Sequence, residues 1–260
     1  MQAIERIGAR TIGHARRIAY ALGFAVEVFR QTGRFFARRK TGTRVLTMQI
    51  LFTGGEALSV VATISLGIGA VIVIQGLSLL AQLGQGQLIY DILIIVITRE
   101  LGPILTALIV TARSGTAIST ELGNMVINHE VEAYTVTGIN PVQHIVVPRF
   151  IGVTLSTFLL NLYFNVFGLA GSFVVTQLVN PIALTEYSQG LLAALSLTDV
   201  VSSVVKSLVF GAITALVATF HGLQVERSST EIPVAAIRSV GRGITLLIVA
   251  NAVITLVYYL

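Results

Sequence analysis

Long stretches without any charged residue constrain this chain more than any other feature of its sequence. Four of them contain no Asp, Glu, Lys or Arg: residues 57–90, 150–185, 207–225 and 243–260. A fifth stretch, residues 91–113, is interrupted between its ends only by Arg99 and Glu100. A helix crosses a bilayer with about 20 mostly apolar residues. The sequence therefore predicts an all-α integral membrane protein with five transmembrane helices, arranged as a single domain over residues 1–260.

The first 44 residues differ from the rest because they are strongly basic, with ten Lys and Arg residues against two Glu residues. Apolar residues recur there at intervals of three and four over residues 3–30, which predicts an amphipathic helix. We interpret residues 1–44 as a basic interfacial arm on the cytoplasmic leaflet, with a connection at 34–43 and a transmembrane core at 50–260. A helix packed on a partner protein is the alternative.

The positions of Lys and Arg predict the orientation of the chain in the membrane. The predicted loops 81–91 and 180–199 contain neither residue, whereas the arm and the intervening loops contain several. Cytoplasmic segments collect Lys and Arg, so we expect a multi-pass protein of the cell inner membrane, N-terminus cytoplasmic and C-terminus periplasmic. Lys206, near the outer end of the fourth span, is expected to extend its ammonium group to the interface. The net charge of +5 reflects this topology and does not indicate a nucleic-acid partner.

Arg99 and Glu100 stand side by side within the second apolar stretch. A charge near the middle of a membrane helix costs about 3 kcal/mol on insertion scales, so such residues usually serve a function. Adjacent helical residues point in different directions, so we expect no close ion pair between these two. Each then needs another partner, which is water, a ligand headgroup or a neighbouring helix.

A cytoplasmic loop of about 35 residues is predicted between the second and third spans, at 113–148. Within it, residues 130–137 can form a short amphipathic helix that ends at Gly138 and the following Asn-Pro turn. A short helix that protrudes from a membrane domain suits docking to a partner, and a surface helix without a partner is the alternative. The spacing partly resembles the loop of ABC importer permeases that inserts into the ATP-binding subunit, through Glu132, Ala133, Gly138, Ile145 and Pro148.

Several chemistries are excluded by inspection. A phosphate-binding P-loop needs Gly before its Lys, and the only two lysines, Lys40 and Lys206, follow Arg and Val. The chain has no Cys, and its four His residues lack the spacing of metal ligands. No nucleophile and base form a recognisable pattern. We therefore expect no catalytic residue, no metal site and no cofactor within this chain, which is not an enzyme by itself.

One block of about 50 residues carries a resemblance to a known family. It includes RELGP at 99–103, ARSG at 112–115, AISTELG at 117–123, and a segment from Gly138 to Arg149. In this block the chain resembles the MlaE/YrbE-type permeases, which are membrane subunits of ABC systems that move lipids together with MCE-domain proteins. The resemblance extends more loosely to the basic arm and to the VxKSxxFG element at 204–211.

The resemblance implies an assembly and a set of site residues. Two copies of the permease join two cytoplasmic ATPase subunits, which bind ATP and Mg, and a periplasmic ring of MCE-domain protein. A phospholipid occupies an outward-open cavity and moves between the inner membrane and the MCE proteins, which contributes to outer-membrane lipid asymmetry. Arg99 and Glu100 would bind this substrate, and Gly102 and Pro103 would kink span two. The ATPase-coupling residues would be Glu130, Glu132, Ala133, Tyr134 and Gly138.

Alternatives remain open on both the residues and the function. Arg99 could pair with a lipid phosphate, or it could be a structural clamp bonded to another span. The chain could be an ABC permease for a different hydrophobic solute. It could also be an ion-driven secondary carrier that uses Glu100 as its proton site.

Overall fold

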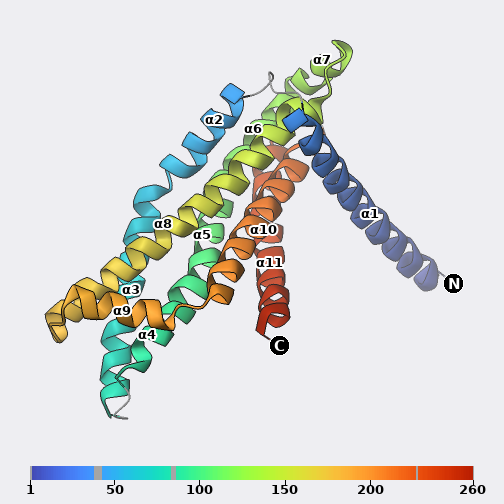
Figure 1. The fold of residues 1–260 in the computed structure, drawn as a ribbon. Coiled ribbons are helices and arrows are strands. Elements are labelled where there is room, and N and C mark those ends of the chain that lie inside the picture. Colours follow the sequence, from blue (N-terminus) through green and yellow to red (C-terminus); the bar gives the residue numbers. More distant parts are fainter. Residues whose placement is uncertain (1, 38–42, 83–85, 227, 260) are drawn as a thin grey trace.

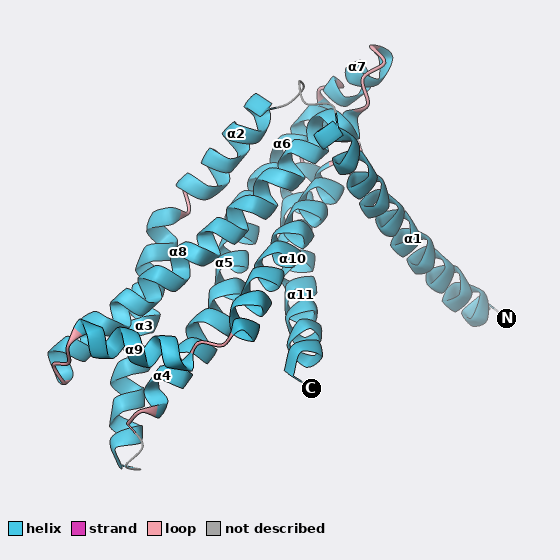
Figure 2. Cartoon of the chain, in the orientation of Figure 1, coloured by secondary structure: helices cyan, strands magenta, loops and turns pink. Residues whose placement is uncertain are grey.

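The computed structural model describes residues 2–37, 43–82, 86–226 and 228–259, and these residues form helices joined by short turns, without strands (Figures 1 and 2). Four of the helical segments are π-helical and carry the label η. In chain order the elements are α1 Gln2–Ala37, α2 Thr43–Ile50, η1 Leu51–Gly55, α3 Leu58–Gln82, α4 Leu88–Leu93, η2 Ile94–Leu101, α5 Gly102–Val110, η3 Thr111–Gly115, α6 Thr116–Ile127, α7 Glu130–Val136, η4 Val142–Val146, α8 Val147–Val179, α9 Leu184–Ala194, α10 Leu197–Gly222 and α11 Glu231–Tyr259.

Five helical stretches of the described residues are long and apolar enough to cross a membrane, which confirms the number predicted from the sequence. They are Leu46–Leu80, Leu88–Ile127, Val142–Val179, Leu197–Gly222 and Glu231–Tyr258. The second runs through α4, η2, α5, η3 and α6. Each stretch contains more residues than the apolar run that predicted it.

The prediction of a long loop at 113–148 is wrong. Residues 111–127 are helical and continue span two through η3 and α6. This part looks polar in the sequence, but its small polar residues face other helices: Thr111 and Ser114 are buried, and the Thr111 and Thr214 hydroxyls lie 2.7 Å apart. Of the residues predicted to form this loop, only α7 and the turns on either side of it therefore protrude beyond the bundle (Figure 1).

The expected outer loop 180–199 is also not a simple loop, because it contains α9. Tyr187 of α9 is buried, and its hydroxyl lies 2.6 Å from Ser172 Oγ and 3.1 Å from the Leu169 carbonyl oxygen. Burial raises the pKa of the Tyr187 phenol above its ordinary value. These contacts hold α9 against the end of α8.

Span three lies at the centre of the bundle, where α8 packs on α2, α3, α5 and α10. Its contact with α3 requires glycine. A Cβ added at Gly69 would lie 2.0 Å from the Gly168 carbonyl oxygen, whereas one added at Gly67 would meet nothing within 4 Å. Such close backbone approach is typical of membrane helix pairs. The hydrophobic effect does not drive helices together within a bilayer, so they associate through the close packing that small residues allow.

The N-terminal arm forms a helix, α1, which extends to Ala37 and is longer than predicted. It meets the bundle near α7 and diverges from it (Figure 1). Aromatic rings join it to the bundle, with centroids 5.6 Å apart for Phe24 and Phe220 and 5.3 Å apart for Phe29 and Phe150. Residues 38–42 of the connection expected at 34–43 lie outside the described residues, and the position of α1 on a lipid leaflet stays a prediction.

Candidate functional site

Arg99 and Glu100 lie near the end of η2, where span two changes from a π-helix to an α-helix. The Gly102 N–H donates to the Ile97 carbonyl oxygen five residues earlier, and Pro103 occupies the first turn of α5. Because η2 continues directly into α5, Pro103 lies inside a helix, and its missing N–H leaves the carbonyl oxygen of Arg99, four residues earlier, without that backbone donor. The irregular part of the helix therefore begins before Gly102, and π-helical turns of this kind often mark functional sites.

Gly102 lets α8 approach this irregular turn. A Cβ at this position would lie 2.6 Å from the Ile97 carbonyl oxygen, 2.8 Å from Asn165 Oδ1 and 2.9 Å from Asn161 Oδ1. Any larger residue would crowd the Ile97 carbonyl oxygen and displace the side chains of these two asparagines. A kink produced by Gly102 and Pro103 stays a prediction, but the glycine has a packing role that the sequence did not reveal.

Lys206 supplies the partner that Glu100 needs. Its Nζ lies 2.9 Å from Glu100 Oε2 and donates to the Arg99 carbonyl oxygen at 3.1 Å. The Lys206 side chain is 0% exposed, so the expectation that it extends to the membrane interface is wrong. The charge is buried between spans two and four because a carboxylate and a carbonyl oxygen replace the water that it loses.

Arg99 and Glu100 also contact each other, against expectation. Arg99 Nε lies 3.4 Å from Glu100 Oε1, since these long side chains bend toward one another although their Cα–Cβ bonds diverge. Two residues of α11 complete the surroundings of the carboxylate: Asn251 Nδ2 lies 3.4 Å from Oε2 and Thr255 Oγ1 lies 3.5 Å from Oε1. We call Arg99, Glu100, Lys206, Asn251 and Thr255 the ionic cluster, which joins spans two, four and five.

The ionic cluster contains two cations, Arg99 and Lys206, and one carboxylate, Glu100. Lys206 is fully buried, whereas the Arg99 side chain is 21% exposed. Arg99 is therefore the cation with access to a bound anion, and Lys206 is the one that holds Glu100 in place.

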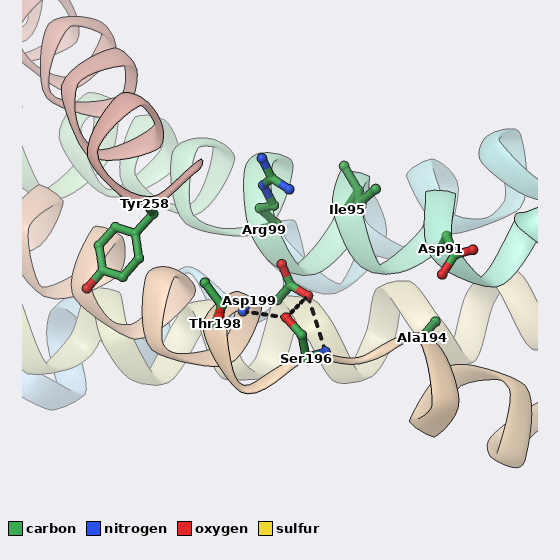
Figure 3. Close-up of a pocket in the computed structure, with 8 residues that line it drawn as sticks. All are labelled: Asp91, Ile95, Arg99, Ala194, Ser196, Thr198, Asp199 and Tyr258. Atoms are coloured by element: carbon green, nitrogen blue, oxygen red, sulfur yellow. Dashed lines mark hydrogen bonds between the residues drawn. The ribbon is translucent and has the colours of Figure 1, made fainter. Parts of the chain in front are cut away.

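A pocket of about 480 Å³ opens beside the ionic cluster (Figure 3). Arg99 is the member of the cluster that lines it. Asp199 is engaged by Ser196, whose Oγ lies 2.5 Å from Asp199 Oδ2, in a capping box that starts α10. The pocket thus combines charges of both signs with an apolar wall, and its lining residues are Asp91, Ile95, Arg99, Ala194, Ser196, Thr198, Asp199 and Tyr258.

The residues predicted to couple to an ATPase lie together at the far tip of the bundle (Figure 1). The structure confirms a short helix there, α7, which ends before Gly138 at φ +77°. Glu130, Glu132 and Ala133 are exposed. Tyr134 is half-buried against His144, with ring centroids 5.3 Å apart. The tip therefore presents acidic and apolar side chains away from the ionic cluster.

Two further ion pairs were not predicted from the sequence, and both connect different spans. Arg149 is buried, with Nη2 2.6 Å from Glu121 Oε1 and Nη1 donating to the Ile145 carbonyl oxygen at 2.9 Å. Arg113 Nη2 lies 2.9 Å from Glu56 Oε2. The first pair joins the helices on either side of α7, so it fixes the base from which α7 protrudes.

Sequence reasoning missed Lys206, Asn251 and Thr255 as members of the site. One signal was available for Lys206, since it is one of only two lysines and lies within a predicted span. Asn251 and Thr255 are four residues apart and hence on one face of α11, but a single Asn and a single Thr in an apolar helix are too common to mark a site.

Five apolar helices, three of which share an ionic cluster, define a multi-pass membrane protein, and comparison with known proteins identifies its kind. Residues 46–257 match the family described as permease MlaE. A probable ABC transporter permease protein of Rickettsia typhi is 29% identical over 211 residues, covering 81% of this chain and 82% of the relative. One of Rickettsia felis is 26% identical over 253 residues, covering 97% and 96%. The protein trigalactosyldiacylglycerol 1, chloroplastic, of Arabidopsis thaliana is 30% identical over 175 residues, covering 67% and 50%.

The chain belongs to the MlaE permease family and is an ABC transporter permease. Permeases of this class are transport subunits, and they work with separate ATPase subunits. This agrees with the lack of a P-loop in the sequence.

Proposed function

We propose that this permease moves phospholipid between the inner membrane and periplasmic MCE-domain proteins, and so contributes to outer-membrane lipid asymmetry. The observation that carries the proposal is the position of Arg99, whose partly exposed side chain lines a pocket with an apolar wall. A phospholipid needs both features, because its phosphate requires a cation and its acyl chains require an apolar surface.

Within this proposal the two residues of the pair have different tasks. Arg99 contacts the headgroup phosphate. Glu100 acts through Arg99 and Lys206, because its carboxylate lies between them at 3.4 Å and 2.9 Å. Glu100 is therefore a positioning residue that holds the arginine and ties together the spans around the pocket. This combines the headgroup contact and the structural clamp that the sequence left as alternatives.

The α7 tip is the proposed contact with the ATPase. Val136, at its end, is 87% exposed, and the acidic side chains of Glu130 and Glu132 are exposed beside it. A protruding helix with an apolar end and charged sides fits a groove on a partner. The Arg149–Glu121 pair would carry movement of α7 into spans two and three.

The assembly and the orientation complete the proposal. Two copies of this chain, two ATPase subunits and a ring of MCE-domain protein form the transporter, with the N-terminus and α7 in the cytoplasm and the C-terminus in the periplasm. The excess of Lys and Arg in the first 44 residues supports this orientation. The name of the Arabidopsis relative contains that of a diacylglycerol lipid, which supports a lipid substrate.

The test is lipid transfer by the complete transporter in proteoliposomes. With Arg99→Ala we expect ATP-dependent transfer of a fluorescent phospholipid to fall by about tenfold, which corresponds to one charge-assisted contact. Arg34→Ala, which removes an exposed arginine of α1, is the matched control and should transfer normally. Normal transfer by the Arg99 variant would remove this residue from the substrate site. ATP turnover stimulated by another hydrophobic solute, but not by phospholipid, would favour the alternative substrate.

A further inference from the structure

A second cavity lies at the opposite end of the bundle from the pocket beside Arg99. It has a volume of about 1080 Å³ and is enclosed by α1, the end of α10 and the beginning of α11. Its lining includes two arginines of α11, Arg238 and Arg242, and two carboxylates, Glu226 and Glu231. None of these four residues belongs to the ionic cluster or to the α7 tip, so the function proposed above does not explain them.

The arginines of this cavity form a paired cationic site. Arg238 and Arg242 are four residues apart on α11 and hence share one face of the helix. Among the side chains that the structure describes, neither is in an ion pair. Arg242 Nη1 lies 3.5 Å from Nε2 of the buried His221. Because arginine can only donate, the histidine nitrogen accepts and does not balance the charge.

The two carboxylates have different roles. Glu231 Oε2 accepts the backbone N–H of Glu226 at 3.0 Å, so Glu231 holds the turn that precedes α11. Glu226 is exposed and lines the same cavity as the arginines. The cavity therefore presents a pair of cations and an accessible carboxylate to one occupant, a pattern suited to a ligand with both charges.

The remaining wall of the cavity is apolar and aromatic. The Tyr20 ring of α1 and the Phe220 ring of α10 lie with centroids 5.9 Å apart, and Val234 of α11 lines the cavity as well. This is also the region where α1 diverges from the bundle (Figure 1). The cavity thus combines ionic groups and apolar surface at the end of the spans, the depth at which lipid headgroups lie.

We propose that this cavity binds a zwitterionic glycerophospholipid with a primary amine, of the phosphatidylethanolamine class, from the leaflet on the α7 side. The phosphate is held by Arg238 and Arg242, the ammonium group donates to Glu226, and the upper acyl chains lie along Tyr20, Phe220 and Val234. The lipid bridges α1 and α11. This site is separate from the transport pocket, and it does not depend on the transported substrate or on the orientation of the chain.

A photoreactive phosphatidylethanolamine, with its reactive group near the top of an acyl chain, tests the proposal on the full-length chain in detergent micelles. We expect labelling of peptides that contain Tyr20 or Val234. Unlabelled phosphatidylethanolamine should compete about tenfold better than phosphatidylcholine, whose quaternary ammonium has no N–H to donate. Unlabelled phosphatidylethanolamine should also compete better than phosphatidylglycerol, by the same factor of about tenfold. Glycerophosphoethanolamine, which lacks acyl chains, should not compete at the same concentration, and equal competition would assign the site to a soluble phosphoamine instead.

Variants locate the recognition in named residues. Arg238→Gln with Arg242→Gln should lower the labelling about tenfold. Arg30→Gln with Arg34→Gln is the matched control, because it removes two α1 arginines at the same spacing and should label normally. Glu226→Gln should abolish the preference over phosphatidylcholine. Arg99→Ala should label normally even if it stops transport, which separates this site from the transport pocket.

Several outcomes would overturn the proposal. They are equal competition by the three lipids, unchanged labelling of the Arg238 and Arg242 double variant, and labelled peptides from other parts of the chain. If the double variant does not elute as a single species like the wild type, the competition measurements on the wild-type chain decide the question alone.

Discussion

Replacing Lys206 by Met removes the ammonium group that lies 2.9 Å from the Glu100 carboxylate and keeps most of the apolar stem. The Lys206 side chain is 0% exposed, so no water replaces the lost interaction on its side. Breaking a buried pair by removal of one partner costs about 3–5 kcal/mol. Glu100 is 29% exposed and keeps Arg99 at 3.4 Å, so we expect the lower end of that range, about 3 kcal/mol.

A second substitution tests whether this cost comes from the unpaired charge. Adding Glu100→Gln removes the unpaired charge, and the double variant should recover to within about 1 kcal/mol of the wild type.

The assay is equilibrium unfolding of the purified chain in mixed micelles of mild and denaturing detergent, followed by the loss of helical circular dichroism. The wild type, both single variants and the double variant give a coupling free energy for the two residues. Arg34→Met, an exposed position of α1, is the control for loss of a cation and should change stability by less than about 0.5 kcal/mol. Additive single effects in the double variant would refute the buried pair.

Three further predictions concern packing and coupling. Gly69→Val should destabilise the chain by about 3 kcal/mol or more in the same assay, because its Cβ would lie 2.0 Å from the Gly168 carbonyl oxygen, whereas Gly67→Val should be nearly neutral. Arg149→Ala should lower the free energy of unfolding by only about 2 kcal/mol, because Glu121 is half-exposed and water partly replaces the lost pair. It should also lower substrate-stimulated ATP turnover, and turnover like that of the wild type would separate this pair from coupling. Glu132→Lys should reduce co-purification of the ATPase subunit without changing membrane insertion, with Glu186→Lys on α9 as control, and equal recovery of the ATPase would contradict the docking of α7.

The sequence determined those properties that depend on the chain locally. The number of spans follows from apolar runs long enough to cross a bilayer, and the helix α7 follows from its position before Gly138 and an Asn-Pro turn. The block around residues 99–149 carried the resemblance to the family that the comparisons then showed. Charge composition alone excluded an internal P-loop, because it left only two lysines to inspect.

The tertiary structure decided which helices meet and which charged groups pair. Lys206 and Glu100 are separated by 106 residues, and no periodicity in either span indicates that they face one another. In a membrane helix both the lipid-facing and the protein-facing sides are apolar, so hydropathy cannot tell which side a neighbouring helix covers. For the same reason the sequence of α6, with its small polar residues, was interpreted as part of a loop. Only the packing of α6 against spans four and five showed that it continues span two.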